Sequence, residues 1–297
     1  MARILVIKLG ALGDLVLAFA PFAAIRARHA GDHVALLTTA PFSELTRAAP
    51  WFDEVLVDAK PSWRNPVGLA RLRRQLRGWD LVYDLQTSGR SSRYFRLAGR
   101  PAWSGIARGC SLPHRDPARD RLHTVERQRG QLADAGITDI PEPDLSWLTE
   151  AGPRLPEPYA LLVPGAAPHR PAKRWPARRF GLLAHHLHGR GLRTVIVGTA
   201  EEKPLADAIR APWPEALDLT GQTSLLDLGG IAARARVAIG NDTGPMHLAA
   251  AVGCPSIVLF SGESDPQLTA PRGAFVRVLR EPDLADMPLE RVAAALP

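Results

Sequence analysis

Short apolar runs alternate with longer, mixed stretches along the first half of the chain. The apolar runs have the length of buried strands, and the mixed stretches have the spacing of amphipathic helices. The predicted strands are RILVIK at 3–8, HVALLT at 33–38, EVLVD at 54–58 and DLVYDL at 80–85, with helices between the first two and around 67–77. This alternation favours a parallel sheet covered by helices.

A second series of the same kind follows a proline-rich stretch at 141–158, which we interpret as a linker. The predicted strands are 159–164, 193–198, 237–240, 256–260 and 275–279, and the predicted helices lie near 176–189, 202–210, 224–234 and 245–252. The expected fold class is therefore α/β, with two doubly wound parallel-sheet domains in tandem. Ligands of such sheets bind beyond the carboxyl ends of the strands, so two domains facing across a cleft would enclose an active site.

Charge changes this picture because it is concentrated in one part of the chain. The net charge is +7, yet residues 61–130 contain fifteen arginines, no lysine and only five acidic residues. Such a surface attracts anions. We expect an anionic substrate or a lipid surface and no nucleic acid, because aromatic residues are few in this region and no nucleic-acid-binding module is recognisable.

The first 25 residues resemble a signal peptide in part, but two charged residues argue against export. Lys8 and Asp14 interrupt the apolar run, and the remainder, 15–25, is too short to span a bilayer. Cys110 and Cys254 lack metal-ligand spacing and fit reduced thiols. A cytoplasmic location is expected.

A turn suited to begin a helix follows the strand predicted at 237–240. In the segment VAIGNDTGPMHLAAAVGCPSIVLF, Asp242 and Thr243 are residue types that cap helices, and a proline follows Gly244. The free N–H groups of such a helix favour a phosphate, which the small Gly244 lets approach, with His247 one turn further on. A capped helix that binds nothing is the alternative.

A basic loop precedes the helix predicted near 176–189. The segment LLVPGAAPHRPAKRWP contains His169, Arg170, Lys173 and Arg174. Such a loop suits a diphosphate, since lysine supplies a point charge and arginine a planar donor fork. A solvated basic loop is the alternative. The GxxxxGK[ST] and GxGxxG patterns are absent, so neither element is a Walker loop or a dinucleotide fingerprint.

A carboxylate stands in the glycine-rich turn after the first predicted strand. In KLGALGDLV at 8–16, Asp14 lies where the next helix begins. Aspartate at such a place caps a helix or acts as a base, and the spacing alone leaves both open.

Three segments together resemble a known enzyme family. They are ILVIKLGALGDLV, PGAAPHRPAKRWP and GNDTGPMHLAAAVGCPSIVLF, and they resemble the ADP-heptose:lipopolysaccharide heptosyltransferases, an inverting family with the GT-B fold of two Rossmann-like domains. The resemblance implies an acceptor-binding domain at 1–150, a donor-binding domain at 151–280 and a C-terminal helix within 281–297 that packs back on the first domain. It also implies an ADP-sugar donor, a lipid-linked anionic sugar acceptor and a peripheral position at the inner face of the cytoplasmic membrane.

The resemblance further assigns roles to residues. Asp14 corresponds to the general base that takes the proton of the acceptor hydroxyl. The expected acceptor-binding residues include Lys8 and Gly13, and the excess of arginine in residues 61–130, rather than the resemblance, adds Arg64, Arg71 and Arg74. The expected donor-binding residues are Lys173, Glu201, Glu202, Thr223, Asp242, Thr243, Gly244 and His247, with the choice between the two glutamates left open.

Other expectations concern the chemistry at the donor. Asp242 is expected to bind protein N–H groups or sugar hydroxyls, because a carboxylate beside a phosphate is unfavourable. No metal and no cofactor are expected, since the chain contains no D-x-D sequence of the kind that holds Mg²⁺. Pro168 and His169 fall where well-known members carry hydroxyl residues, which leaves the donor open. A nucleotide-sugar 2-epimerase and a non-catalytic binder of anionic surfaces are the alternative functions.

Overall fold

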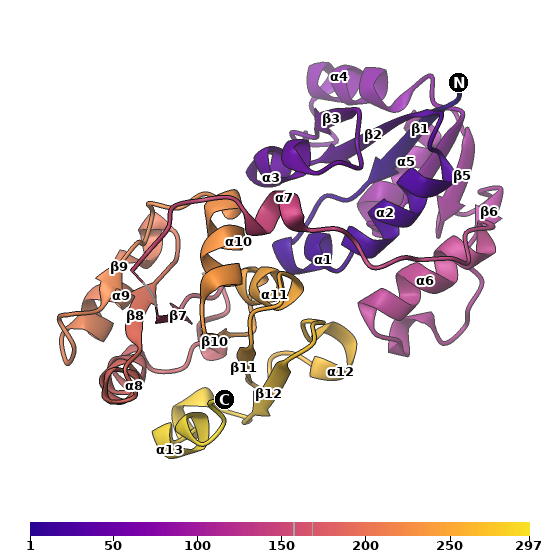
Figure 1. Cartoon of the computed structure of the whole chain (residues 1–297). Coiled ribbons are helices and arrows are strands. Elements are labelled where there is room, and N and C mark those ends of the chain that lie inside the picture. Colours follow the sequence, from indigo (N-terminus) through magenta and orange to yellow (C-terminus); the bar gives the residue numbers. More distant parts are fainter. Residues whose placement is uncertain (157, 168) are drawn as a thin grey trace. The chain divides into compact units, whose positions relative to one another are not determined.

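The computed structural model describes residues 1–156, 158–167 and 169–297. Pro168 therefore lies outside the described residues. The chain divides into two compact units, Met1–Asp144 and Leu145–Pro297 (Figure 1). Each unit contains one six-stranded sheet in which all paired strands are parallel.

The first unit has the strand order β3-β2-β1-β4-β5-β6. Its strands are β1 Arg3–Ile7, β2 His33–Thr38, β3 Glu54–Val57, β4 Leu81–Asp84, β5 Ala102–Gly105 and β6 Leu112–Pro113. Its helices are α1 Leu12–Val16, α2 Phe19–Arg28, α3 Ser43–Ala48, α4 Pro66–Leu76, α5 Gly89–Leu97 and α6 Thr124–Asp134, with short 3-10 helices at Ala40–Phe42 and Arg119–Arg121. The four strands predicted here are confirmed to within one residue at each end.

The central strands of this unit are apolar along their whole length because helices cover both faces of the sheet. All four residues from Ile4 to Ile7 are buried. On one face, Leu72 of α4 and Tyr94 of α5 belong to the same apolar cluster as Leu5. The strand β5 was not predicted because its sequence, AWSG, contains little apolar character, although Trp103 is completely buried.

The second unit has the strand order β12-β11-β10-β7-β8-β9. Its strands are β7 Tyr159–Val163, β8 Arg193–Ile196, β9 Leu217–Asp218, β10 Val237–Asn241, β11 Ser256–Phe260 and β12 Val276–Arg280. Its helices are α7 Ser146–Thr149, α8 Ala177–Gly189, α9 Lys203–Arg210, α10 Leu225–Arg234, α11 Gly244–Ala251, α12 Pro266–Thr269 and α13 Leu289–Ala293. Short 3-10 helices are η3 Pro171–Lys173, η4 Ala200–Glu202 and η5 Leu284–Asp286.

Two segments of the second unit bear on specific predictions. The stretch interpreted as a linker contains α7, which packs on α10, so the first unit ends at Asp144 rather than near residue 150. The resemblance implied that 281–297 returns to the first domain. Within the second unit, α13 packs on α8, and the apolar side chain of Val292 is fully buried in the core. The Trp175 indole N–H also donates to the Met287 carbonyl oxygen (2.9 Å). A contact of this segment with the first unit stays a prediction.

The two sheets share one topology, in which the strand order reverses beside the first strand of each unit. In the first unit the reversal lies between β1 and β4, and in the second between β7 and β10. Doubly wound sheets bind ligands in the crevice at the carboxyl ends of these strands. Among the described residues, no helix has the length and apolar character needed to cross a bilayer.

Candidate functional site

A polar cavity of about 270 Å³ lies at the carboxyl ends of β1 and β4 in the first unit. The loops after both strands contribute to it, together with the segment at 119–131. Its charged and amide side chains are those of Lys8, Asp14, Gln86, Arg119, Asp120, Arg127, Gln128 and Gln131. The cavity therefore occupies the position at which this topology binds ligands.

Lys8 follows β1 and is held in place by the loop after β4. Its side chain is only 3% exposed, and Nζ donates to the Leu85 carbonyl oxygen (3.0 Å). The Leu9 N–H donates to Gln86 Oε1 (2.7 Å) and joins the same two loops. Burial lowers the pKa of Lys8, whereas the charges of Asp14 and Asp84 oppose that shift. The ammonium group thus lies between two carboxylates.

Asp14 lies half-buried in the first turn of α1 and does not act as its cap. The cap residue is Ala11, and no side chain caps this helix end. The charge of Asp14 acts on both Lys8 and Arg127, where it opposes the fall in pKa that burial causes. The Asp14 side chain therefore makes no hydrogen bond that would cap α1. It lines the cavity together with Lys8 and Arg127.

Gly10 explains why the turn before Asp14 requires glycine. Its φ is +109°, and a Cβ built there would lie 2.4 Å from a ring carbon of Phe42. Any other residue would be strained in this conformation and would collide with the ring.

Two arginines that the sequence analysis did not select line the cavity. Arg119 donates to the Thr87 hydroxyl and pairs with Asp120 (3.0 Å), and Arg127 donates to the Thr124 hydroxyl (2.8 Å). Burial and the charge of Arg119 lower the pKa of Arg127. Cations crowded in this way favour an anionic ligand. Both arginines lie in the arginine-rich region noted above, which was the only signal for them.

The arginines that were predicted to bind the acceptor are not part of this cavity. Arg64 precedes α4, and Arg71 and Arg74 lie on its exposed face. Gly13 is buried within α1 and offers no side chain. Of the predicted acceptor residues, Lys8 lines the cavity beside the predicted base Asp14, and the roles of all these residues stay predictions.

Asp84 ends β4 beneath the cavity and is fully buried. Burial raises the pKa of its carboxyl to about 6, although hydrogen bonds, including one from the Thr87 N–H (3.0 Å), and the charge of Lys8 act in the opposite direction. This carboxyl accordingly gains or loses its proton in mildly acidic solution.

Asp84→Asn is expected to change how stability depends on pH. The pKa in the folded protein, about 6, exceeds the unfolded value of 3.8, so the folded state binds this proton more tightly. The protonated Asp84 carboxyl stabilises the folded state fully below about pH 4, and this contribution is lost as the pH rises through about 6. For a pKa shift of about two units, the contribution to the free energy of unfolding is about 3 kcal/mol. Thermal unfolding across this range should show a fall in wild-type Tm relative to the variant. Parallel pH profiles of the two proteins would contradict this account.

In the second unit, Asn241 ties the end of β10 to the loop that follows β7. Its side chain is completely buried. Nδ2 donates to the carbonyl oxygens of Pro164 (2.7 Å) and Gly165 (3.2 Å), and Oδ1 accepts from the Trp175 N–H (2.9 Å). The basic loop and the NDTGP turn are therefore neighbours, as two parts of one site require.

Lys173 and Asp242 form a buried ion pair at this place. Lys173 Nζ lies 2.5 Å from Asp242 Oδ2, and the two side chains are 12% and 7% exposed. Ser264 Oγ donates to the same carboxylate oxygen (2.7 Å). The protein N–H donor that Asp242 was expected to bind is therefore the ammonium group of Lys173, the residue that was itself predicted to bind phosphate. Binding of sugar hydroxyls by Asp242 stays a prediction.

The helix α11 begins at Gly244, as the turn predicted, with Pro245 in its first turn. The cap residue is Thr243, but its side chain makes no capping hydrogen bond, so the cap expected from the residue types is not formed. His247 is buried within this helix at 5% exposure. In its first turn Pro245 has no N–H, and the Met246 N–H donates to the Thr243 carbonyl oxygen (3.0 Å), so the Gly244 N–H is the candidate donor to an anion at this helix end.

The structure distinguishes the two candidate glutamates. Glu202 Oε2 accepts from the Thr199 N–H (2.8 Å), and a Cβ built on Gly165 would lie 1.7 Å from Glu202 Oε1. Glu202 therefore lies against the loop after β7, whereas Glu201 is exposed. The turn before Thr223 also approaches this place, because a Cβ built on Gly221 would lie 3.0 Å from Ala200.

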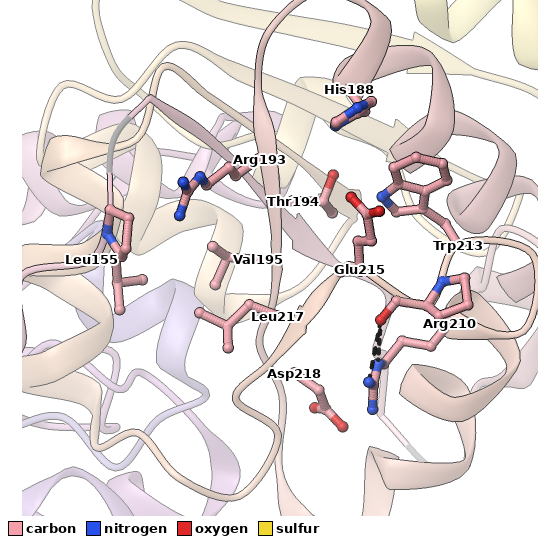
Figure 2. A pocket seen from close by; sticks show the side chains of 13 residues that line it. Leu155, His188, Arg193, Thr194, Val195, Arg210, Trp213, Glu215, Leu217 and Asp218 are labelled. Atoms are coloured by element: carbon pink, nitrogen blue, oxygen red, sulfur yellow. Dashed lines mark hydrogen bonds between the residues drawn. The ribbon is translucent and has the colours of Figure 1, made fainter.

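A larger cavity of about 650 Å³ lies elsewhere in the second unit, beside β8 and the edge strand β9 (Figure 2). Val195 and Leu217 form part of its apolar wall. Arg210 donates to a backbone carbonyl at its rim, and the Asp218 carboxylate accepts from Lys203. No residue predicted to bind donor or acceptor lines this cavity, so its size alone does not make it the site.

Comparisons with known proteins agree with this arrangement. The sequence profile of glycosyltransferase family 9 (heptosyltransferase) matches residues 69–293. Lipooligosaccharide heptosyltransferase 2 of Haemophilus ducreyi is 25% identical over 94% of this chain and 88% of its own length. The corresponding enzyme of Haemophilus influenzae is 36% identical, but this match spans 41% of the chain and 36% of that relative.

A solved structure shares the fold over almost the whole chain. The E. coli heptosyltransferase WaaC with ADP-2-deoxy-2-fluoro heptose superimposes with a TM-score of 0.81 at 21% identity and covers 98% of each chain. The predicted fold, with two parallel α/β sheets of the GT-B type, is therefore confirmed. The matched segment spans most of both units. This chain belongs to glycosyltransferase family 9, the heptosyltransferases.

Proposed function

We propose that this enzyme transfers heptose from ADP-heptose to an acidic sugar of a lipopolysaccharide acceptor, with inversion at the anomeric carbon. The observation that carries the proposal is the cavity of the first unit, where the Asp14 carboxylate lies with Lys8, Arg119 and Arg127. A base among cations suits an acceptor that is anionic and also supplies a nucleophilic hydroxyl. The names of the relatives support heptose as the sugar and lipopolysaccharide as the acceptor class.

In the proposed reaction, Asp14 accepts the proton of the acceptor hydroxyl while that oxygen bonds to the anomeric carbon. The bond between this carbon and the distal phosphate oxygen of ADP breaks, and ADP leaves with the bonding electrons. The transition state has the oxocarbenium character known from glycoside hydrolysis. Lys8 and Arg127 line the same cavity as Asp14 and are the proposed contacts to the acidic group of the acceptor.

The second unit is proposed to hold ADP-heptose at the carboxyl ends of β7 and β10. Lys173, the Gly244 N–H at the start of α11 and His247 would stabilise the charge that develops on the departing diphosphate. Because Asp242 already binds Lys173, the ammonium group is positioned before the donor arrives. Glu202 of η4 packs against the loop after β7 and is the proposed partner of the ribose hydroxyls. The backbone near Thr223 is the proposed partner of the nucleotide base.

The lipid-linked acceptor places the proposed reaction at the inner face of the cytoplasmic membrane. The exposed side chains of Arg64, Arg71 and Arg74 are the proposed contacts to acidic groups of the acceptor or of the membrane, since they are unshielded by other residues.

The proposal predicts turnover only when donor and acceptor are both present. The enzyme is incubated with ADP-heptose and lipopolysaccharide that lacks heptose, and ADP release and the mass of the lipid product are measured. A gain of one heptose with equimolar ADP is expected. Conversion of a nucleotide sugar without an acceptor would favour an epimerase, and binding of lipopolysaccharide without any turnover would favour a non-catalytic protein.

A further inference from the structure

Two glutamines on the same face of α6 differ in their hydrogen bonds. Gln128 and Gln131 are both buried, at 4% and 1% exposure, and both line the cavity of the first unit. Gln131 Nε2 donates to the Asp84 carbonyl oxygen (3.0 Å) and to the backbone and side chain of Ser104 (3.3 Å each). Within the described part of the chain, neither amide atom of Gln128 has a hydrogen-bond partner.

The burial of Gln128 is not explained by packing. A buried amide without partners is less favourable than an apolar side chain of similar size, and each such group in a native protein requires an explanation. Because Gln128 lines the cavity, its amide is available to whatever the cavity binds. The cavity, at about 270 Å³, can take part of a sugar rather than a single water molecule.

The amide of Gln128 selects among ligand groups by its chemistry. It offers two N–H donors and one carbonyl acceptor. A phosphate or carboxylate only accepts hydrogen bonds and would leave the carbonyl oxygen without a donor. A hydroxyl group donates and accepts, so it satisfies both halves of the amide, alone or with a neighbouring hydroxyl.

The cations of the same cavity bind the other part of such a ligand. Thr124, Arg127, Gln128 and Gln131 recur at the three- and four-residue spacing that places them on one face of α6. Arg127 together with Lys8 and Arg119 suits an acid group, while Gln128 suits a hydroxyl. The two requirements are met by one sugar that carries both groups.

We infer that Gln128 is a specificity-determining residue that hydrogen-bonds a hydroxyl of the acceptor sugar other than the hydroxyl that attacks. This inference rests on the proposed function, because it takes the cavity of the first unit as the acceptor site. It assigns to Gln128 the recognition of the sugar ring and leaves the proton transfer to Asp14.

Gln128→Leu and Gln131→Leu form a matched pair for the test. For Gln128→Leu, we expect a Tm equal to or above that of the wild type, because no hydrogen bond is lost, and a fall in acceptor kcat/KM of about 10- to 100-fold, as expected for one or two lost hydrogen bonds. The KM for ADP-heptose should not change. Gln131→Leu should lower the Tm, since it removes bonds to Asp84 and Ser104.

Isothermal calorimetry with heptose-free lipopolysaccharide and no donor supplies a readout that does not depend on turnover. We expect weaker acceptor binding by Gln128→Leu, with partial recovery in Gln128→Asn. A loss of Tm in Gln128→Leu as large as that in Gln131→Leu would show a structural role and overturn the inference. Wild-type kcat/KM and acceptor affinity in Gln128→Leu would overturn it as well, while an inactive wild type would contradict the proposed function itself.

Discussion

Asp14→Asn is expected to lower kcat by about 10²- to 10⁴-fold, the usual contribution of a general base, with donor affinity unchanged. The substitution keeps the size of the side chain but removes its ability to accept the proton of the acceptor hydroxyl. Stability should change little, because the Asp14 side chain does not cap α1. The measurement is kcat at saturating ADP-heptose and acceptor, together with the Kd for ADP and the Tm.

Asp120→Asn is the matched control for this experiment. Asp120 lines the same cavity, but its side chain is 89% exposed and pairs with Arg119. Its loss should leave kcat within a few-fold of the wild type. If Asp14→Asn retained wild-type kcat, or if both variants lost activity equally, Asp14 would not be the base and the proposed mechanism would be wrong.

Lys173→Met is expected to lower the free energy of unfolding by about 3 to 5 kcal/mol, as is typical when one member of a buried ion pair is removed. Among the described residues, the Asp242 carboxylate, 7% exposed, would keep only the Ser264 hydroxyl as a side-chain partner. Affinity for ADP should fall as well, because the same ammonium group is proposed to bind the diphosphate. Urea unfolding and calorimetry with ADP measure the two effects separately.

The double variant Lys173→Met/Asp242→Asn separates stability from binding. It removes the uncompensated charge, so stability should return toward the wild type while ADP affinity stays low. Lys203→Met is the control, because Lys203 also pairs with an aspartate, Asp218, but its side chain is 49% exposed. It should lose less stability and bind ADP normally. ADP affinity at the wild-type level in the double variant would remove Lys173 from the donor site.

The positions of nine strands were readable from the sequence because short apolar runs are typical of buried parallel strands, whereas β5, β6 and β9 were not predicted. The NDTGP turn was readable for a related reason: proline behind a small residue is compatible with a helix start and with little else. Asp14 was selected because a carboxylate in a glycine-rich turn is unexpected, and the cavity around it agrees with that choice.

Other features depend on contacts between distant parts of the chain and left no local signal. Lys173 and Asp242 are 69 positions apart and each seemed destined for a ligand, yet they bind each other. Arg119 and Arg127 reach the cavity only because α6 returns to the end of β4. Arg64 was selected for its charge alone. Charge does not distinguish an arginine on a solvent-exposed surface from one in a binding site.

The hydrogen bond between Trp175 and Met287 joins two segments of the second unit that are synthesised at different times. Trp175 follows the loop that carries Lys173. Its backbone N–H donates to Asn241 Oδ1, and its indole N–H donates to the Met287 carbonyl oxygen. A nascent chain can finish the first unit, residues 1–144, while the rest is still being made. The loop that carries Lys173 can gain this anchor only after residue 287 has been synthesised, 112 positions after Trp175.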